Sequence, residues 1–382
     1  MDGNKESGTP LSQSLVANIQ LGLPGTISKL SAKMRFIDLM APLLKEAGVI
    51  KNVELLHPFS IRASGISTSN RTTNAFGGIL YAAGAVRQDV LIQEGAIYKT
   101  RQESLVSVDE IDDLDLNKKL KFINMINTYR LLEEMMNDDE KPDLIMTDIP
   151  LVLERSDAPP EGWSNVQELY KKCRAVIKQF WVKNKENIFP FNEQGVKVAS
   201  IGSKRFGAVI FAINKENISY VADRIDLDKV ARIETEMPRI REVGIKRLLQ
   251  GILVKRTRTA AFQFDVVNKD NRLEPELLRN LGVTGMHIKA GNNTPPLLVE
   301  VVGSVTDWTP GRLDRLASEV MTLITFDQAK ALPIPLWYAK YALKPLEVKP
   351  GVLEFYKAQT RERLKNEDLE QVWKQDLDAF ED

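Results

Sequence analysis

The hydrophobic pattern of this chain changes from a helical to a strand-like spacing early in the sequence. Apolar residues at positions 11–49 recur at helical spacing, and Pro24-Gly25 predicts a break into two helices. Three apolar runs follow. The second of them, GILYAAGAV, has almost no polar residue, which is typical of a strand buried on both faces. Three such runs predict an antiparallel meander, with the polar residues 67–74 in a loop. The runs are residues 59–67, 78–86 and 90–100.

A strongly amphipathic helix is predicted over residues 117–137. Its apolar stripe has steps of four, three and seven residues and consists of Phe122, Ile126, Tyr129 and Met136. Glu133 falls on the same stripe, whereas Glu134 lies one step round the helix and is expected to be more exposed. A carboxylate that faces the core is costly unless it is paired or bound to a metal. Either Glu133 has such a role, or it lies at the edge of the stripe and its carboxylate reaches water.

A short buried strand is predicted at residues 144–147, and it ends in an acidic residue. Asp148 is at its C-terminal end, and Pro150 stops the strand just after it. A carboxylate in this position is a common ligand of a divalent metal. An Asp at the start of a loop also commonly caps a turn, so the stretch alone leaves both interpretations open.

Helices and strands alternate along the rest of the chain. This alternation indicates an α/β protein in which a mixed sheet is flanked by helices. The helices are predicted at residues 163–185, 311–324 and 336–343, and the strands at 196–203, 208–213, 253–267 and 296–303.

Composition limits the chemistry that this chain can perform. The 382 residues include 52 basic and 52 acidic side chains, so the formal net charge is zero and no global basic field attracts nucleic acid. Cys173 is the only cysteine, which excludes disulfide frameworks and cysteine–zinc sites and fits a reducing, cytoplasmic location. His57 and His287 are too few for a histidine-rich metal site. No apolar run is long enough to predict a membrane span, and no P-loop, Rossmann, HExxH or GxSxG motif is found.

Three segments resemble the NurA nuclease family. Residues 61–67 (IRASGIS), with the GGILYAAGAV that follows, are similar to the family's first strand, which carries an Asp-Gly-Ser motif. Residues 144–151 (LIMTDIPL) are similar to the strand that ends in the family's second Asp motif. Residues 295–301 and 331–340 resemble its C-terminal strand and its Tyr-Pro-x-Pro-Leu…Ala-His motif.

The resemblance spans about residues 55–345 and implies a ribonuclease-H-like fold. It also implies a homodimeric DNA nuclease that depends on Mn²⁺ or Mg²⁺ and processes DNA ends with a HerA-type hexameric ATPase. In nucleases of this fold, carboxylates from the first strand, the helix and the next strand hold two metals. The expected organisation is an N-terminal helical arm at 1–54, a NurA-like domain at 55–345 with an insertion at about 215–295, and a charged helical tail at 346–382.

The positions of the family's metal ligands are partly substituted. Its first-strand Asp, C-terminal Tyr and His fall on Ser64, Leu332 and Lys340. Asp148 remains as a catalytic and metal-binding candidate, together with Glu133 or Glu134 from the helix. Lys340 near Asp148 would place an ammonium group where a metal is expected. We therefore interpret the metal site as degraded.

The next two strands carry candidates that would replace the carboxylate lost from the first strand. Asp89, Glu94 and Glu103 lie on or near them, and each would need to point to the same face as the site. With such a replacement, the chain would be a nuclease with a different ligand set.

Three basic groups are candidates for DNA contact, namely Lys204-Arg205, Lys246-Arg247, and Lys255 and Arg256 with Arg258. The alternative is an ordinary solvated surface, which is the default for a chain without net charge. Taken together, the resemblance and its substituted positions imply a NurA-like DNA-end-processing subunit that works with a HerA-type ATPase and is weak or inactive as a two-metal nuclease. The alternative is a non-catalytic scaffold or regulator that binds the ATPase or DNA.

Overall fold

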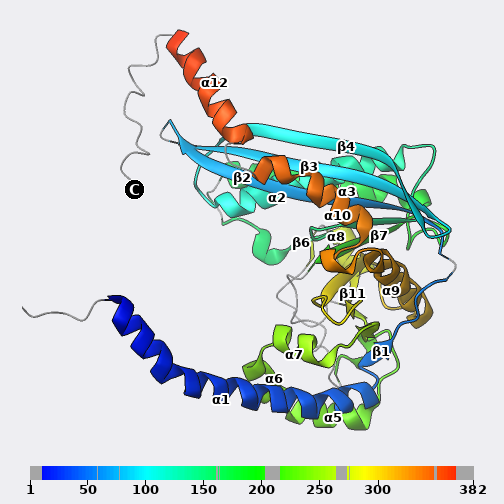
Figure 1. Ribbon diagram of the computed structural model, residues 1–382. Coiled ribbons are helices and arrows are strands. Elements are labelled where there is room, and N and C mark those ends of the chain that lie inside the picture. Colours follow the sequence, from blue (N-terminus) through cyan, green and yellow to red (C-terminus); the bar gives the residue numbers. More distant parts are fainter. Residues whose placement is uncertain are drawn as a thin grey trace, which may run out of the picture.

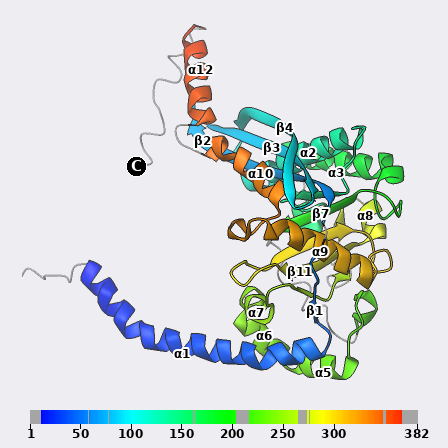
Figure 2. The ribbon, with the colours of Figure 1, turned by 45° about the vertical axis from the view of Figure 1, so that its right-hand side comes forward.

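A large mixed β-sheet forms the centre of the protein, and helices cover both of its faces (Figure 1). The computed structural model describes residues 11–57, 59–76, 78–160, 162, 164–202, 216–263, 273–274, 276–347 and 351–366. Helix α1, Leu11–Glu46, packs along α5 and α7 at its C-terminal end, and its N-terminal end extends away from the rest of the protein in both views (Figures 1 and 2). Among the described helices, none is both long enough and apolar enough to cross a membrane.

The described strands and helices have the following bounds. The strands are β1 Ile50–Asn52, β2 Ile61–Ala75, β3 Gly78–Gln93, β4 Ala96–Ile111, β5 Leu144–Thr147, β6 Leu153–Glu154, β7 Lys197–Gly202, β8 Thr257–Thr259, β9 Phe262–Gln263, β10 Leu273–Glu274, β11 Val283–Lys289 and β12 Leu297–Val302. The α-helices after α1 are α2 Leu116–Met136, α3 Ser164–Lys183, α5 Leu227–Thr235, α6 Met237–Val243, α7 Ile245–Ile252, α8 Glu276–Leu281, α9 Pro310–Thr325, α10 Ile334–Ala342, α11 Lys344–Glu347 and α12 Val352–Asn366. The short 3-10 helices are η1 Arg155–Asp157, η2 Lys185–Asn187, η3 Ile218–Tyr220 and η5 Gln328–Lys330.

Ten of the described strands form one sheet in the order β1-β8-β11-β12-β7-β5-β2-β3-β4, with β9 paired to β11. The pairs β2–β3 and β3–β4 are antiparallel, whereas β5 is parallel to both β2 and β7. A parallel strand needs a crossover connection, and α2 supplies it between β4 and β5. The predicted α/β class is confirmed, as is the ribonuclease-H-like order of three strands, a helix and a strand.

The strands of the meander are longer than the sequence pattern predicts. β2 pairs with β3 without interruption from Ile61 to Ala75, so residues 67–74 belong to the strand and the predicted loop is wrong. This polar stretch stays extended because β3 satisfies its backbone N–H and C=O groups on one side. Likewise, β3 continues to Gln93, and β4 covers residues 96–111 in place of the predicted 90–100.

Helix α1 passes through Pro24 without the predicted break at Pro24-Gly25. Proline has no N–H and removes the hydrogen bond to the carbonyl four residues earlier. This part of α1 is exposed, so water can bind that carbonyl and the loss is small. In addition, the Thr26 hydroxyl donates to the carbonyl oxygen of Gly22 at 3.1 Å.

Different helices cover the two faces of the central strands. Phe122 of α2 belongs to the same core cluster as Ile66 of β2, whereas Leu336 of α10 packs in the cluster that contains Ala63. Successive side chains of a strand point to opposite faces. In this part of β2, even-numbered residues therefore face α2 and odd-numbered residues face α10, and this alternation decides which side chains can meet in a site.

His287 makes the stability of the fold depend on pH. It is fully buried on β11, and burial lowers the pKa of its imidazole to about 3. The unfolded chain takes up this proton near pH 6.5, whereas the folded chain does so only near its lowered pKa. The stability that His287 contributes is complete above about pH 6.5 and is lost as the pH falls towards 3, by about 1.4 kcal/mol per pH unit.

At pH 4.5 we expect this loss to be about 2.7 kcal/mol relative to neutral pH. Urea unfolding of the wild type and of His287→Gln at several pH values measures it, because the variant lacks the extra slope. His57→Gln is the matched control, since His57 is exposed. An identical slope in wild type and His287→Gln would contradict the prediction.

Candidate functional site

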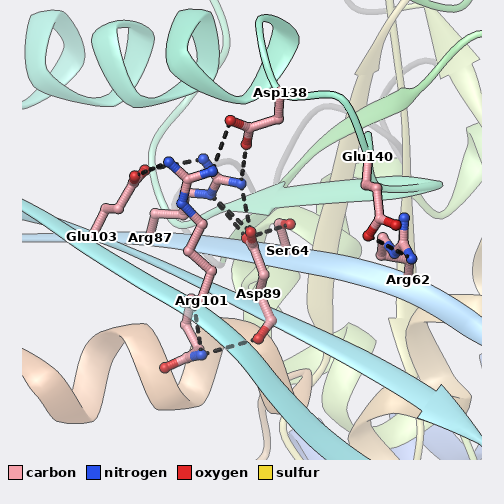
Figure 3. A network of polar contacts seen from close by, with 9 residues as sticks. Arg62, Ser64, Arg87, Asp89, Arg101, Glu103, Asp138 and Glu140 are labelled. Carbon is pink, nitrogen blue, oxygen red and sulfur yellow. Dashed lines mark hydrogen bonds and ion pairs between the residues drawn. The ribbon is translucent and has the colours of Figure 1, made fainter.

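A group of charged side chains lies on the α2 face of the meander (Figure 3). The register pairs Arg87 of β3 with Glu103 of β4, and Asp89 with Arg101, so all four side chains point to one face. Asp138, just after α2, lies above them. We call this group the Arg87 network, which consists of Ser64, Arg87, Asp89, Arg101, Glu103 and Asp138.

The guanidinium group of Arg87 lies between three carboxylates. Its Nε is 2.9 and 3.0 Å from the two oxygens of Asp89, and its Nη2 is 2.5 Å from Asp89 Oδ2. Nη1 donates to Glu103 Oε2 at 3.0 Å, and Nη2 donates to Asp138 Oδ2 at 2.5 Å. Burial alone would lower the pKa of Arg87, but the hydrogen bonds to Asp89 and Asp138 outweigh it and raise the pKa above its ordinary value. Arg87 is thus a permanent buried cation.

Ser64 and Arg101 complete the network. The Ser64 hydroxyl donates to Asp89 Oδ1 at 2.6 Å. Arg101 is ion-paired with Glu103 and with Asp138, at 2.7 Å from Asp138 Oδ1. Three carboxylates and two guanidinium groups leave the network with a formal charge of about −1.

Two of the three proposed replacement carboxylates therefore lie beside Ser64. Asp89 is its direct partner on β3, and Glu103 is on the next strand. However, the cation that they surround is Arg87 of the protein itself. Glu94 is exposed at the turn between β3 and β4, with a φ of 51°, and is outside the network.

Asp148 is held from the other face of β2. Its Oδ2 accepts a hydrogen bond of 2.5 Å from the Ser67 hydroxyl, and its Oδ1 accepts one of 3.2 Å from the backbone N–H of Thr68. Ser67 is three residues from Ser64 on a regular strand, so the two side chains point to opposite faces. The first-strand residue that faces Asp148 is thus Ser67 and not Ser64. It is also a serine, so the first strand supplies no carboxylate to Asp148.

The acidic residues of α2 are directed elsewhere. Glu133 is ion-paired with Lys183 and accepts a hydrogen bond of 2.9 Å from Asn184 Nδ2, both at the end of α3. Glu134 is exposed. Among the described contacts, none joins either glutamate to Asp148. The inward position of Glu133 is explained by its contacts with α3.

Lys340 and Leu332 lie near α10. Lys340 is exposed, and the described ion pairs do not join it to Asp148. Leu332 is half-buried and packs against the core cluster that includes Leu336. The cation that the described ion pairs place among three carboxylates is Arg87.

The basic residues suggested for DNA contact have different positions. Lys204 and Arg205 lie outside the described residues. Lys255 and Arg256 are exposed in the turn before β8, so their contact with DNA stays a prediction. Arg258 is fully buried instead, and its Nη1 and Nη2 donate to the two oxygens of Asp223 at 2.7 and 2.8 Å.

Arg258 is also bound through its Nε, which donates to Asp314 at 2.7 Å. A guanidinium group with no exposed surface has no access to a phosphate in this structure. The strand-like pattern of residues 253–267 grouped Arg258 with its basic neighbours. Its carboxylate partners could not be found from this pattern, because they are 35 and 56 residues away in sequence.

A surface of aromatic and lysine side chains on and around α10 was not foreseen from the sequence. The Lys330 Nζ is 4.7 Å from the ring centre of Trp337, and the Lys344 Nζ is 4.5 Å from that of Tyr341. The Trp337 and Tyr341 rings are themselves 5.3 Å apart. We call this surface the aromatic–lysine patch, which consists of Lys99, Lys330, Trp337, Tyr338, Tyr341 and Lys344.

In the described part of the chain, the lysines of this patch contact aromatic rings and not carboxylates. Lys99 lies 3.7 Å from the ring centre of Tyr338. None of the described ion pairs involves Lys99, Lys330 or Lys344. The sequence signal was the spacing of Trp337, Tyr338 and Tyr341, which places three aromatic rings on one side of a helix.

Comparison with known proteins identifies the fold. No protein-family model matches the sequence, and no curated protein matches it either. Among solved structures, the NurA nuclease from Sulfolobus solfataricus is similar with a TM-score of 0.54 and 12% sequence identity, over 86% of this chain and 91% of that chain. The fold is NurA-like. A structure of NurA bound to dAMP and manganese gives a TM-score of 0.43 and 9% identity, over 94% of this chain and 98% of that chain.

The described residues around Asp148 and Arg87 can be compared with the needs of a paired divalent-metal site. Mn²⁺ and Mg²⁺ prefer several oxygen ligands, with carboxylates to balance their charge. Asp148 has the hydroxyl of Ser67 beside it, and the carboxylates of the Arg87 network already surround a guanidinium group. In the part of the chain that is described, no group of three or more His, Cys, Asp or Glu side chains is placed to hold a metal ion.

Proposed function

We propose that this protein is a DNA-binding subunit of a DNA-end-processing assembly and lacks a two-metal nuclease centre of its own. Its proposed partner is a HerA-type hexameric ATPase, and its proposed state is a homodimer. The observation that carries this proposal is Ser67 beside Asp148, because the first strand supplies a hydroxyl where two carboxylates would have to meet. The NurA-like fold supports the assignment to DNA processing.

Charge explains why this difference matters. Two divalent ions bring four positive charges close together, and such a pair is stable only among several carboxylates. Asp148 supplies one negative charge, and the neutral hydroxyl of Ser67 adds none. The carboxylates of Asp89 and Asp138 are on the other side of the sheet and are paired with Arg87.

A cleavage assay tests the absence of nuclease activity. The purified protein is incubated with Mn²⁺ and with linear duplex or single-stranded DNA, with and without a HerA-type ATPase. We expect no more cleavage by the wild type than by Asp148→Ala. Cleavage that Asp148→Ala abolishes would contradict the proposal.

A nuclease with a different ligand set is the second candidate. The three carboxylates of the Arg87 network favour it, because they already lie together around one cation. For this candidate, Asp89→Asn abolishes cleavage whereas Asp148→Ala preserves it. The two variants therefore separate this alternative from a nuclease centred on Asp148.

We also propose that the aromatic–lysine patch binds single-stranded DNA. Stacked bases and backbone phosphates need aromatic faces and unpaired cations close together, and the patch provides both. Replacing Lys330 and Lys344 with alanine is expected to reduce the slope of log affinity against log salt concentration by about 1.4, since each phosphate contact on a single strand contributes about 0.7. Fluorescence anisotropy of a labelled oligothymidine at several salt concentrations measures this slope.

The control for this measurement is Lys171→Ala with Lys178→Ala. It removes the same charge from exposed positions of α3. An equal change of slope in both double variants would mean that only net charge matters and would contradict the assignment of the patch.

A further inference from the structure

The exposed part of helix α1 carries an apolar stripe that the described residues of its own chain leave uncovered. In both views the N-terminal end of α1 extends away from the other labelled elements (Figures 1 and 2). Seven large apolar side chains in it are between 41% and 62% exposed, namely Leu15, Val16, Ile19, Leu23, Ile27, Leu30 and Met34. So many half-exposed apolar side chains on one helix indicate a surface for a partner.

The stripe is continuous with a packed one. Val16, Leu23, Leu30, Ile37 and Leu44 are spaced seven residues apart, which is the repeat of a helix that packs along another helix. The last two of these are 1% and 0% exposed and lie in the core cluster with residues of α5 and α7. The first three continue the same stripe into solvent. A helix whose stripe is packed at one end and bare at the other is suited to take up a second helix along the bare part.

Five residues of the bare part of the stripe are placed symmetrically about Leu23. Ile19 and Ile27 are four residues to either side of it, and Val16 and Leu30 are seven residues to either side. In a pair related by a two-fold axis, the same surface of each copy faces the other. Two antiparallel copies of one helix therefore match only if the apolar pattern of the stripe reads the same in both directions. Residues 16–30 of the stripe meet this condition when residue i lies opposite residue 46 minus i, whereas Leu15 and Met34 lie opposite Ser31 and Ser12. We propose that α1 pairs in an antiparallel manner with α1 of a second copy, with Leu23 opposite Leu23.

Charge and length agree with this pairing. Residues 11–28 contain no charged side chain, and Lys29 and Lys33 are the first that follow. In an antiparallel pair each lysine lies opposite an uncharged residue, Ala17 or Gln13. In a parallel pair each lysine would lie opposite its own copy and repel it. The overlap covers residues 12–34, which is about 34 Å of helix and long enough for a stable pair.

The backbone near the axis allows close approach. A Cβ atom added to Gly22 or Gly25 would meet nothing within 4 Å. The lack of charge in this segment gives no basis for recognition of DNA or of an acidic partner. The inference rests on the homodimer of the proposed function, but not on DNA binding or on the ATPase.

Disulfide formation between introduced cysteines in the full-length protein tests the pairing. The native Cys173 does not interfere, because it is buried and burial raises the pKa of its thiol to about 12. On mild oxidation, Leu23→Cys should form a covalent dimer with itself. Val16→Cys and Leu30→Cys should each remain uncoupled alone and should couple to one another when mixed. Leu21→Cys is the control, since Leu21 is 81% exposed and off the stripe.

The pattern of coupling decides among the alternatives. Coupling of Val16→Cys with itself and of Leu30→Cys with itself would indicate a parallel pair and overturn the proposal. Failure of Leu23→Cys to couple, or coupling no faster than that of Leu21→Cys, would also overturn it. If coupling fails, light scattering of the wild type shows which proposal is wrong. A dimeric wild type would refute only the α1 pairing, whereas a monomeric wild type would refute both the α1 pairing and the homodimer of the proposed function.

A second variant checks that the interface and not the fold is affected. Leu23→Asp places a charge at the two-fold axis, where it would face its own copy. We expect the mass from light scattering to fall from that of a dimer to that of a monomer, with an unchanged circular-dichroism spectrum, because Leu23 is 51% exposed within its own chain. A dimer that persists in Leu23→Asp would contradict the proposed axis.

Discussion

Replacing Arg87 with methionine is expected to lower the free energy of unfolding by about 3–5 kcal/mol, because removing one partner of a buried ion pair leaves the other charges uncompensated. Only 2% of the Arg87 side chain is exposed, and 11% and 17% of the Asp89 and Asp138 side chains. Methionine fills a similar space without the charge. Urea unfolding measures the loss, and Arg101→Met is the matched control. The Arg101 side chain is 46% exposed, so its loss should cost about 1 kcal/mol or less.

The same variant tests whether the guanidinium group of Arg87 occupies a position in which a metal ion would be stable. Without Arg87, the carboxylates of Asp89, Glu103 and Asp138 are left with Arg101 as their described cation. We expect Mn²⁺ to raise the melting temperature of Arg87→Met, because an ion that binds only the folded state stabilises it, and to leave that of the wild type unchanged. An Arg87→Met variant as stable as the wild type, with or without Mn²⁺, would contradict the role of the buried cation.

Gly65→Ala is expected to destabilise the protein by about 3 kcal/mol or more, because it overfills a tightly packed contact. A Cβ atom at this position would lie 2.3 Å from the backbone N of Leu336 and 2.4 Å from the backbone C of Pro335. Side chains can rotate away from such a contact, but backbone atoms cannot. The start of α10 would therefore have to move off β2. Thermal unfolding of the variant measures the effect.

Gly22→Ala is the control for this substitution. It is in the exposed part of α1, where an added Cβ meets nothing within 4 Å. Alanine is favoured over glycine in a helix by up to about 1 kcal/mol, so this variant should be neutral or slightly more stable. If Gly65→Ala were as stable as Gly22→Ala, the close contact between β2 and α10 would be contradicted.

Some elements were predictable because local sequence determines them. Helix α2 and strand β5 follow from the apolar stripe and from the stop at Pro150, and both lie where predicted. The length of β2 was not predictable in this way, since residues 67–74 are polar and are held extended by pairing with β3. Pairing partners far away in sequence leave no local pattern.

The same limit of local sequence patterns applies to the residues of the site. A motif places a residue along a strand, but the register and the alternation of the strand decide which face it points to. Ser64 and Ser67 are both in the motif-like segment, and only the structure shows that Ser67 meets Asp148. The sequence offered Asp89, Glu94 and Glu103 as alternative replacements for a carboxylate at Ser64. The position of Arg87 between Asp89 and Glu103 depends on the register of three strands and on Asp138 after α2.

Calorimetric titration of Mn²⁺ into the wild-type protein tests the central claim most directly, because it measures metal binding without DNA, partner or turnover. The claim is that Asp148 with Ser67, and the carboxylates around Arg87, do not form a divalent-metal site. The predicted result is no saturable binding of Mn²⁺, with identical traces for the wild type and Asp148→Ala. Tight, saturable binding to the wild type that Asp148→Ala abolishes would contradict the claim.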